Sequence, residues 1–139
     1  MITVNKLSTA PLIKYVVGTG GVLKGQLAMT SSSTAVIATE GASTAVIIGV
    51  AADDYEAGEI GLFYDIRGRE IEIDIYQGST VDVFADSDIG KAFDIYHAGT
   101  TAEYFIDPND VAGAMFVVQS YDNTRKIATA RIISALCYV

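Results

Sequence analysis

Charged and apolar residues alternate without interruption over the stretch EIEIDI at residues 70–75. Because successive side chains of a strand point to opposite faces, we expect the isoleucines of this stretch to enter a core and the acids to face water. The isoleucines are Ile71, Ile73 and Ile75, and the acids are Glu70, Glu72 and Asp74. The apolar run before them, residues 62–66, ends at Arg67 and Gly68, which predicts a hairpin between the two runs.

Turn signals recur along the rest of the chain at a spacing of roughly ten residues, which favours an all-β sandwich or barrel. Further strands are expected at residues 12–17, 22–29, 80–84, 92–96, 103–106, 114–121 and 126–139. At most one short helical turn is expected, with Asp107 as its cap and Pro108 at its first position.

The sequence Ser-Thr-Ala-Val-Ile occurs at residues 33–37 and again at 43–47, on either side of a Glu-Gly pair, which predicts a second hairpin. Residues 35–37 and 45–50 carry no charge, and an exposed edge of this kind would pair with another chain. We therefore expect this hairpin inside the barrel or in a subunit contact. The residues that we expect in such a contact are Val36, Ile37, Val46 and Ile47.

The first eleven residues contain few apolar side chains and end at Pro11, which removes a ladder donor. We expect residues 1–11 to form an N-terminal arm without a packed strand, and residues 12–139 to form a single β domain. Three arm residues are expected at an interface: Ile2, Val4 and Leu7. So short a segment buries too little surface to offset its ordering entropy, so we expect it to be mobile until it pairs with a partner.

The formal net charge of −8 opposes contact with nucleic-acid phosphates, and the nine Lys and Arg residues form no basic run. We therefore expect no direct DNA or RNA partner. The apolar runs are too short to cross a bilayer, and nothing resembles a signal peptide, so we expect no membrane association and folding in a cytoplasm. Cys137 is the only cysteine, which excludes an internal disulfide and predicts a buried core side chain.

The residue inventory argues against catalysis, so we expect no enzymatic activity, metal or cofactor. His97, the only histidine, follows a strand end and is expected to be a rim residue without an identifiable nucleophile. One group of aspartates lacks the glycine and the terminal glutamate of a calcium loop, so we interpret its members as solvated turn residues. They are Asp82, Asp86, Asp88 and Asp94.

A second acidic group is expected to be a solvated loop or to meet a basic surface on a partner. Its members are Asp53, Asp54, Glu56 and Glu59, of which Glu56 and Glu59 are the candidate contact residues. The eight tyrosines and five phenylalanines are expected in core and cross-strand packing.

Several short motifs follow one another in a recognisable order. They are Thr9-Ala10-Pro11, Gly20-Gly21-Val22-Leu23-Lys24-Gly25-Gln26-Leu27, Gly49-Val50-Ala51-Ala52, Ala57-Gly58-Glu59-Ile60-Gly61, Ile89-Gly90-Lys91-Ala92-Phe93-Asp94-Ile95-Tyr96 and Gly113-Ala114-Met115-Phe116-Val117-Val118. Over most of the chain this order resembles the phage head decoration, or capsid cement, proteins. The resemblance implies a small β-barrel or β-tulip-like subunit, usually a homotrimer, on the outer surface of an icosahedral head. Such a subunit clamps neighbouring major capsid proteins and has no catalytic residues.

The leading hypothesis is therefore a structural capsid decoration protein of the virion, made in the host cytoplasm, whose partners are the major capsid protein and further copies of itself, as a homotrimer. The alternative is a non-catalytic carbohydrate-binding or adhesin β-module with a platform of exposed tyrosines, which a pocket lined by aromatic and polar groups would favour. A barrel enzyme comes third. The phage, the capsid partner, the symmetry axis and the strand order stay open at this point.

Overall fold

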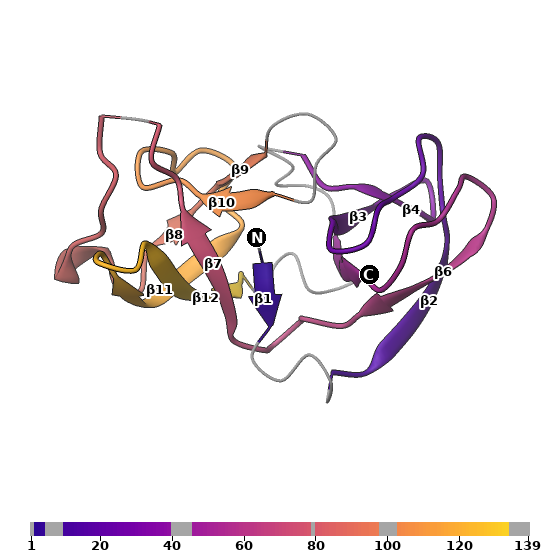
Figure 1. Ribbon diagram of the computed structural model, residues 1–139, viewed down its shortest axis with the longest axis horizontal. Coiled ribbons are helices and arrows are strands. Elements are labelled where there is room, and N and C mark those ends of the chain that lie inside the picture. Colours follow the sequence, from indigo (N-terminus) through magenta and orange to yellow (C-terminus); the bar gives the residue numbers. More distant parts are fainter. Residues whose placement is uncertain (1, 5–9, 40–45, 79, 98–102, 134–139) are drawn as a thin grey trace.

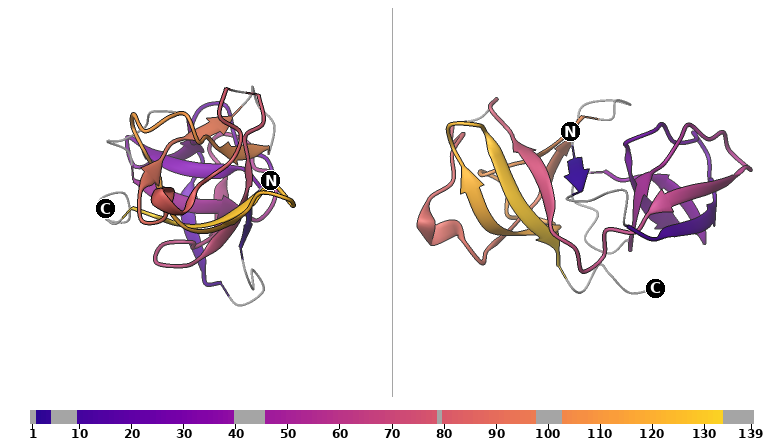
Figure 2. Two further views of the ribbon diagram at one scale, coloured as in Figure 1. Left: turned by 90° about the vertical axis from the view of Figure 1, so that its left-hand side faces the viewer. Right: turned by 60° about the horizontal axis from the view of Figure 1, so that its bottom comes forward.

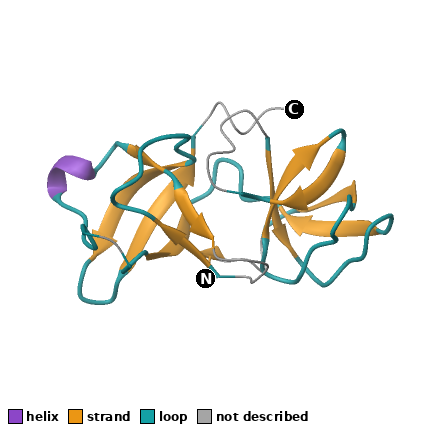
Figure 3. Cartoon of the chain, turned by 90° about the horizontal axis from the view of Figure 1, so that it is seen from above, coloured by secondary structure: helices purple, strands orange, loops and turns teal. Residues whose placement is uncertain are grey.

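The computed structural model describes residues 2–4, 10–39, 46–78, 80–97 and 103–133. The described residues are all-β and contain one 3-10 helix, η2 (Asp86–Asp88), which lies at one end of the molecule in Figure 3. This confirms the predicted all-β class, including the limit of one short helical turn. The strands form two sheets, which lie side by side along the long axis of the molecule (Figure 1).

The first sheet, called barrel A, occupies the half of the molecule that Figure 1 shows on the left. It contains β1 (Ile2–Val4), β7 (Ile71–Ile75), β8 (Ala92–Phe93), β9 (Ile95–His97), β10 (Tyr104–Ile106), β11 (Phe116–Asp122) and β12 (Ile127–Ile132). The strand order is β8-β11-β12-β7-β10-β9, with β1 added to β7. Because β8 and β9 follow each other in the chain with only Asp94 between them, the two ends of this order meet. The sheet is thus nearly closed.

The interior of barrel A is filled by every second residue of its strands. Ile71, Ile73 and Ile75 are buried on β7, whereas Glu72 and Asp74 on the same strand are only partly covered, which confirms the strand faces predicted from their alternation. The other strands contribute Phe93, Ile95, Tyr104, Ile106, Phe116, Val118, Ala128, Ala130 and Ile132.

The second sheet, called barrel B, contains β2 (Leu12–Val16), β3 (Leu27–Ser31), β4 (Thr34–Ile37), β5 (Ile47–Ala51) and β6 (Ile60–Tyr64). The order is β2-β6-β5-β3-β4, and a parallel bridge from Val17 to Ala35 brings the two edge strands together. The nitrogen of Gly18 donates to the oxygen of Ala35 at 2.8 Å beside this bridge. Most of the side chains buried in its interior are small. The buried residues are Val17, Val22, Ala28, Ala35, Ile48, Ala51 and Phe63.

A shared cluster of buried side chains joins the two barrels. Figure 2 shows the ribbons of the two barrels from two further directions. Leu27, Ile47 and Val50 of barrel B pack into the same cluster as the interior of barrel A. The hydroxyl of Tyr104 lies 3.2 Å from the carbonyl oxygens of both Leu27 and Ala38. Burial raises the pKa of the Tyr104 hydroxyl above its usual range, so it stays protonated and able to donate. All five residues of β5 are buried, as we expected for the uncharged segment.

Two predicted hairpins are wrong. The β4 and β5 segments do not pair with each other, because β3 lies between them and pairs with both. Likewise β6 and β7 belong to different barrels, and the turn at Arg67 and Gly68 carries the chain from one to the other. Arg67 holds this crossover through bonds of 2.9 and 3.0 Å to the two carboxylate oxygens of Asp65.

The missed hairpin connects β3 to β4 through Ser32 and Ser33. Both serines have positive φ, 47° and 70°, as a two-residue type I′ turn requires. The sequence rule for this turn looks for Asn or Gly, so two serines resembled loop residues.

The arm also differs from the prediction where it is described. Residues Ile2–Val4 form a strand, β1, that pairs antiparallel with β7 in the same chain, with Thr3 opposite Glu72. β1 takes the first part of an edge of β7 whose last two residues pair with β10. The pairing of β1 with β7 could not be predicted from the sequence, because it depends on how much of the β7 edge β10 leaves unpaired. Leu7 and Cys137 lie outside the described residues.

Candidate functional site

Residues 80–84 were predicted to be a strand, and this prediction is wrong: the described part of the segment has no ladder partner. Side-chain amides bind its backbone instead. The side-chain nitrogen of Gln77 donates to the backbone oxygens of Ile75 and Asp82, at 3.0 and 3.1 Å. Two asparagines from distant loops fix the segment at its two ends, so it is held in place without belonging to a sheet.

The first of these asparagines is Asn109. Its side-chain oxygen accepts from the nitrogen of Val81 at 3.0 Å, and its side-chain nitrogen donates to the oxygen of Val81 at 2.6 Å. This paired contact imitates the two bonds between opposite residues of an antiparallel ladder. Asp107 orients the amide, because its carboxylate accepts from both nitrogens of Asn109 at 2.9 and 3.1 Å.

The second asparagine is Asn123, in the turn between β11 and β12. Its side chain accepts from the nitrogen of Phe84 at 3.1 Å and donates to the oxygen of Phe84 at 2.9 Å. The ring of Phe84 is buried against Phe93, with 5.0 Å between the ring centroids. The segment is thus anchored by an aromatic side chain as well as by two amides.

The loop that carries Asn109 is itself fastened to barrel A at the kink between β8 and β9. The nitrogen of Asp94 donates to the oxygen of Asp110, and the oxygen of Asp94 accepts from Asp107, at 2.8 and 3.0 Å. The Asp94 carboxylate accepts from the nitrogen of Ile95 at 2.8 Å. Asp94 is buried, so the prediction that it is a solvated turn residue is wrong. The turn predicted at Asp107 is present as a single hydrogen-bonded turn, in which the nitrogen of Asp110 donates to the oxygen of Asp107 at 3.2 Å and the Asp107 carboxylate accepts from the nitrogen of Asn109. It is not a helix: the 3-10 helix of the described residues is η2.

The two fastened loops expose apolar side chains, which we call the loop surface: Val81, Val83 and Val111. The same loops also carry three carboxylates, those of Asp82, Asp107 and Asp110. Nearby, the Tyr121 hydroxyl donates to Asp86 at 2.6 Å, which raises the pKa of Tyr121. The loop surface therefore combines exposed apolar groups, negative charge and a backbone fixed by side chains.

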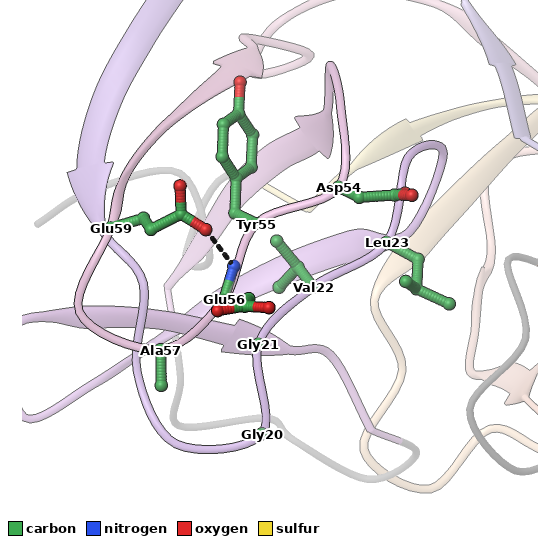
Figure 4. A pocket seen from close by; sticks show the side chains of 9 residues that line it. All are labelled: Gly20, Gly21, Val22, Leu23, Asp54, Tyr55, Glu56, Ala57 and Glu59. Carbon is green, nitrogen blue, oxygen red and sulfur yellow. Dashed lines mark hydrogen bonds between the residues drawn. The ribbon is translucent and has the colours of Figure 1, made fainter.

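A second candidate site is a pocket of about 550 Å³ on barrel B (Figure 4). It is lined by Gly20, Gly21, Val22, Leu23, Asp54, Tyr55, Glu56, Ala57 and Glu59. A pair of bonds between Val22 and Tyr55, at 2.9 and 2.8 Å, brings its two walls together. Glycine is required at position 21, because φ is +67° and an added Cβ would lie 2.6 Å from the oxygen of Tyr55.

The carboxylates of this pocket partly satisfy its own backbone. The Asp54 carboxylate accepts from the nitrogen of Lys24 at 2.8 Å, and that of Glu59 accepts from the nitrogen of Glu56 at 2.7 Å. In Figure 4 the ring of Tyr55 points away from the two glycines. Its centroid lies 6.2 Å from that of Phe63 in the barrel interior. The pocket therefore offers carboxylates and backbone rather than a broad aromatic face.

The structure does not gather the predicted contact residues at one place. Val36 and Ile37 lie on β4 and are partly covered, as is Val46, whereas Ile47 is fully buried. Ile47 thus cannot reach a partner, because β5 lies against barrel A. Ile2 and Val4 lie on β1, while the exposed Glu56 and Glu59 lie at the pocket.

The remaining candidates form no reactive cluster. His97 stacks on Tyr104 with 4.0 Å between ring centroids. Among the residues that the structure describes, no group of three or more His, Cys, Asp and Glu side chains is placed to hold a metal ion. No helix in the described ranges has the length and apolar character needed to cross a membrane. Sequence reasoning missed the loop surface. The two asparagine side chains that fix it, called the clamps of Asn109 and Asn123, bind backbone atoms 28 and 39 positions away in the sequence.

No protein-family model matches the chain, and no curated protein matches it either.

Proposed function

We propose that the protein is a non-catalytic structural subunit that decorates the outer surface of a phage head and attaches to the major capsid protein through the loop surface. One observation carries the proposal: exposed valines stand on loops whose backbones are fixed by the clamps of Asn109 and Asn123. A surface fixed before binding loses little conformational entropy when it binds. The motif order that resembles capsid cement proteins supports the same function.

Charge and exposure also support this assignment. Exposed apolar side chains on loops that also carry carboxylates fit a protein surface with apolar and basic groups, because complementary charges direct association and exclude other partners. A protein that binds only the assembled shell stabilises it by mass action. The predicted homotrimer and virion location belong to the same proposal.

The first test is whether a gene beside that of this chain encodes a major capsid protein; heads assembled from that protein then serve as the binding partner. The wild-type chain is expected to sediment with the heads and to raise their temperature of disruption. Val81→Asp places a charge in the contact and should abolish sedimentation with heads. Leu23→Asp is the matched control, because Leu23 is 47% exposed and Val81 is 45% exposed.

Three outcomes contradict the proposal or its site. A wild-type chain that stays in the supernatant removes the decoration function. Binding by Val81→Asp as strong as the wild type removes the loop surface from the contact. A loss caused by Leu23→Asp alone transfers the attachment to the pocket on barrel B.

A second candidate function, a ligand-binding β-module, is supported by the pocket itself, because its cavity of about 550 Å³ contains Tyr55 and three carboxylates. Polar pocket groups of this kind orient small polar ligands such as sugars. Neutral oligosaccharides titrated against the labelled protein should then shift the amide resonances of Gly21 and Glu56, and Glu59→Gln should weaken the shift. Unchanged spectra at millimolar sugar would remove this candidate.

A further inference from the structure

The pocket on barrel B has a shape that the fold itself fixes. Val22 and Tyr55 exchange backbone bonds of 2.9 and 2.8 Å, which hold the two loops of the pocket against each other. The nitrogen of Glu59 donates to the oxygen of Glu56 at 3.1 Å and closes the turn of the second loop. A cavity whose walls are already held in place loses little conformational entropy when a ligand enters it.

The charged side chains that line this cavity are all carboxylates: Asp54, Glu56 and Glu59. Two of them are held by backbone nitrogens, because Asp54 accepts from Lys24 at 2.8 Å and Glu59 accepts from Glu56 at 2.7 Å. The Glu56 carboxylate forms no hydrogen bond or ion pair with the described residues. A cavity that carries only negative side chains has a negative potential and attracts a cation.

The other lining groups fit an organic cation rather than a metal ion. Within the described residues, the acidic side chains are not placed to hold one metal ion together. In the view of Figure 4, Asp54 lies on the side of Leu23, and Glu59 lies on the opposite side. Leu23 is 47% exposed, and Val22 and Tyr55 line the same cavity. An aliphatic stem can lie on such apolar groups while the charged end that it carries meets a carboxylate.

The rim of the cavity is open to water, since Asp54, Glu56, Ala57 and Glu59 are exposed residues. A free small molecule binds best where a site encloses most of its surface, and this rim does not enclose one. A side chain on a second polypeptide needs only its end enclosed, because the rest of that polypeptide contacts the surrounding surface. The open rim therefore favours a side chain as the ligand.

We propose that this pocket binds an arginine side chain of a partner protein, with the guanidinium at the Glu56 carboxylate and the aliphatic stem on Leu23. A guanidinium has five donors in one plane, which suits carboxylates that are spread around a cavity better than the compact charge of a lysine does. The inference gives the pocket a different ligand from the neutral sugars of the second candidate function. It holds whether or not the chain attaches to heads.

Nuclear magnetic resonance titration of the full chain with arginine whose amino and carboxyl groups are blocked tests the proposal. This ligand should shift the amide resonances of Gly21 and Glu56 with a millimolar dissociation constant, and added salt should weaken the binding. Blocked citrulline is the matched control ligand, because it has nearly the same shape without the charge, and it should bind about fivefold more weakly or worse. A pentapeptide with a central arginine between glycines should bind more tightly than the blocked amino acid.

Two variants with the same change of net charge locate the site. Glu56→Gln removes the carboxylate that no described residue binds, and it should weaken binding of blocked arginine about threefold. Glu72→Gln, on the outward face of β7 in barrel A, is the matched control and should bind like the wild type. Circular dichroism checks that both variants stay folded, as expected for substitutions outside the cores.

Blocked citrulline or blocked lysine that binds as tightly as blocked arginine would overturn the proposal, as would equal binding by Glu56→Gln and Glu72→Gln. A pentapeptide that binds more weakly than the blocked amino acid would contradict a partner protein as the source of the ligand. Resonance shifts caused by neutral oligosaccharides but not by blocked arginine would return the pocket to the second candidate function. A chain that binds blocked arginine but not heads would remove the decoration function and leave this inference intact, so the two failures are distinguishable.

Discussion

Barrel A and barrel B fill their interiors in different ways. Barrel A encloses large side chains, among them Ile71, Ile73 and Phe116, and also receives side chains from the outer face of barrel B. In barrel B the fully buried side chains are mostly alanine and valine around the ring of Phe63, against which Tyr15 and Tyr55 pack partly buried. Barrel A thus depends on apolar volume, whereas barrel B depends on close approach of its strands. The same class of fold therefore tolerates different substitutions in its two halves.

The largest expected effect is in barrel A. Ile73→Asp places a carboxylate in the barrel interior, where Ile73 is buried, and should cost more than about 4 kcal/mol, enough to unfold the chain. Glu72→Lys, on the outward face of the same strand, should change the free energy of unfolding by less than about 0.5 kcal/mol. Urea unfolding followed by circular dichroism measures both. Equal destabilisation by the two variants would contradict the strand faces.

The next effect tests the close packing of barrel B. An added Cβ at Gly49 would overlap the carbonyl oxygen of Tyr64 on the neighbouring strand, so Gly49→Ala should cost about 1–3 kcal/mol. Gly58→Ala meets open space, and its cost of about 1–2 kcal/mol comes only from φ of +90°. Thermal unfolding measures both variants. A melting temperature of Gly49→Ala equal to that of the wild type would contradict the close packing of barrel B.

The strand pattern of β7 was predictable because alternation alone decides which face is buried. Which strands belong to which barrel was not predictable. Turn residues such as Arg67 and Gly68 occur both in hairpins and in connections between sheets, so they do not distinguish the two. The clamps of Asn109 and Asn123 were also invisible, since each joins loops that only the fold brings together. The acidic loop at Glu56 and Glu59 was found from charge alone, but its pocket depends on the bond between Val22 and Tyr55.

A smaller effect tests the connection between the barrels. Tyr104→Phe removes the hydroxyl that bonds the carbonyls of Leu27 and Ala38, and should cost about 1–2 kcal/mol. The oxygen of Leu27 still accepts from the nitrogen of Ala38 at 2.8 Å, which limits the loss. Tyr64→Phe, on the outward face of β6, is the control and should cost less than about 0.5 kcal/mol. Equal values for the two variants in urea would contradict the role of the Tyr104 hydroxyl.

The smallest effect concerns the crossover between the barrels. Partial burial raises the pKa of the Asp65 carboxyl, but the hydrogen bonds and charge of Arg67 outweigh it, so this pKa lies below its ordinary value of 3.8. A lowered pKa in the folded state stabilises the fold above pH 3.8, and this stabilisation disappears as pH falls through the folded value.

Asp65→Asn should therefore cost about 0.5 kcal/mol at neutral pH, because the pair is partly exposed. The difference from the wild type should shrink as pH falls below 3.8, which stability measurements across this range would detect. A difference that grows with acidity would contradict the assignment.

The central claim is that the two barrels form one cooperative body around their shared core. Amide hydrogen exchange in low urea tests it at two bonded amides, Ile75 to Lys126 in barrel A and Ala51 to Gln26 in barrel B, both at 2.9 Å. The account predicts that both amides exchange through one global opening with the same free energy and the same urea dependence. Exchange of Ala51 through a smaller opening, while Ile75 stays protected, would show that barrel B unfolds alone and would contradict the claim.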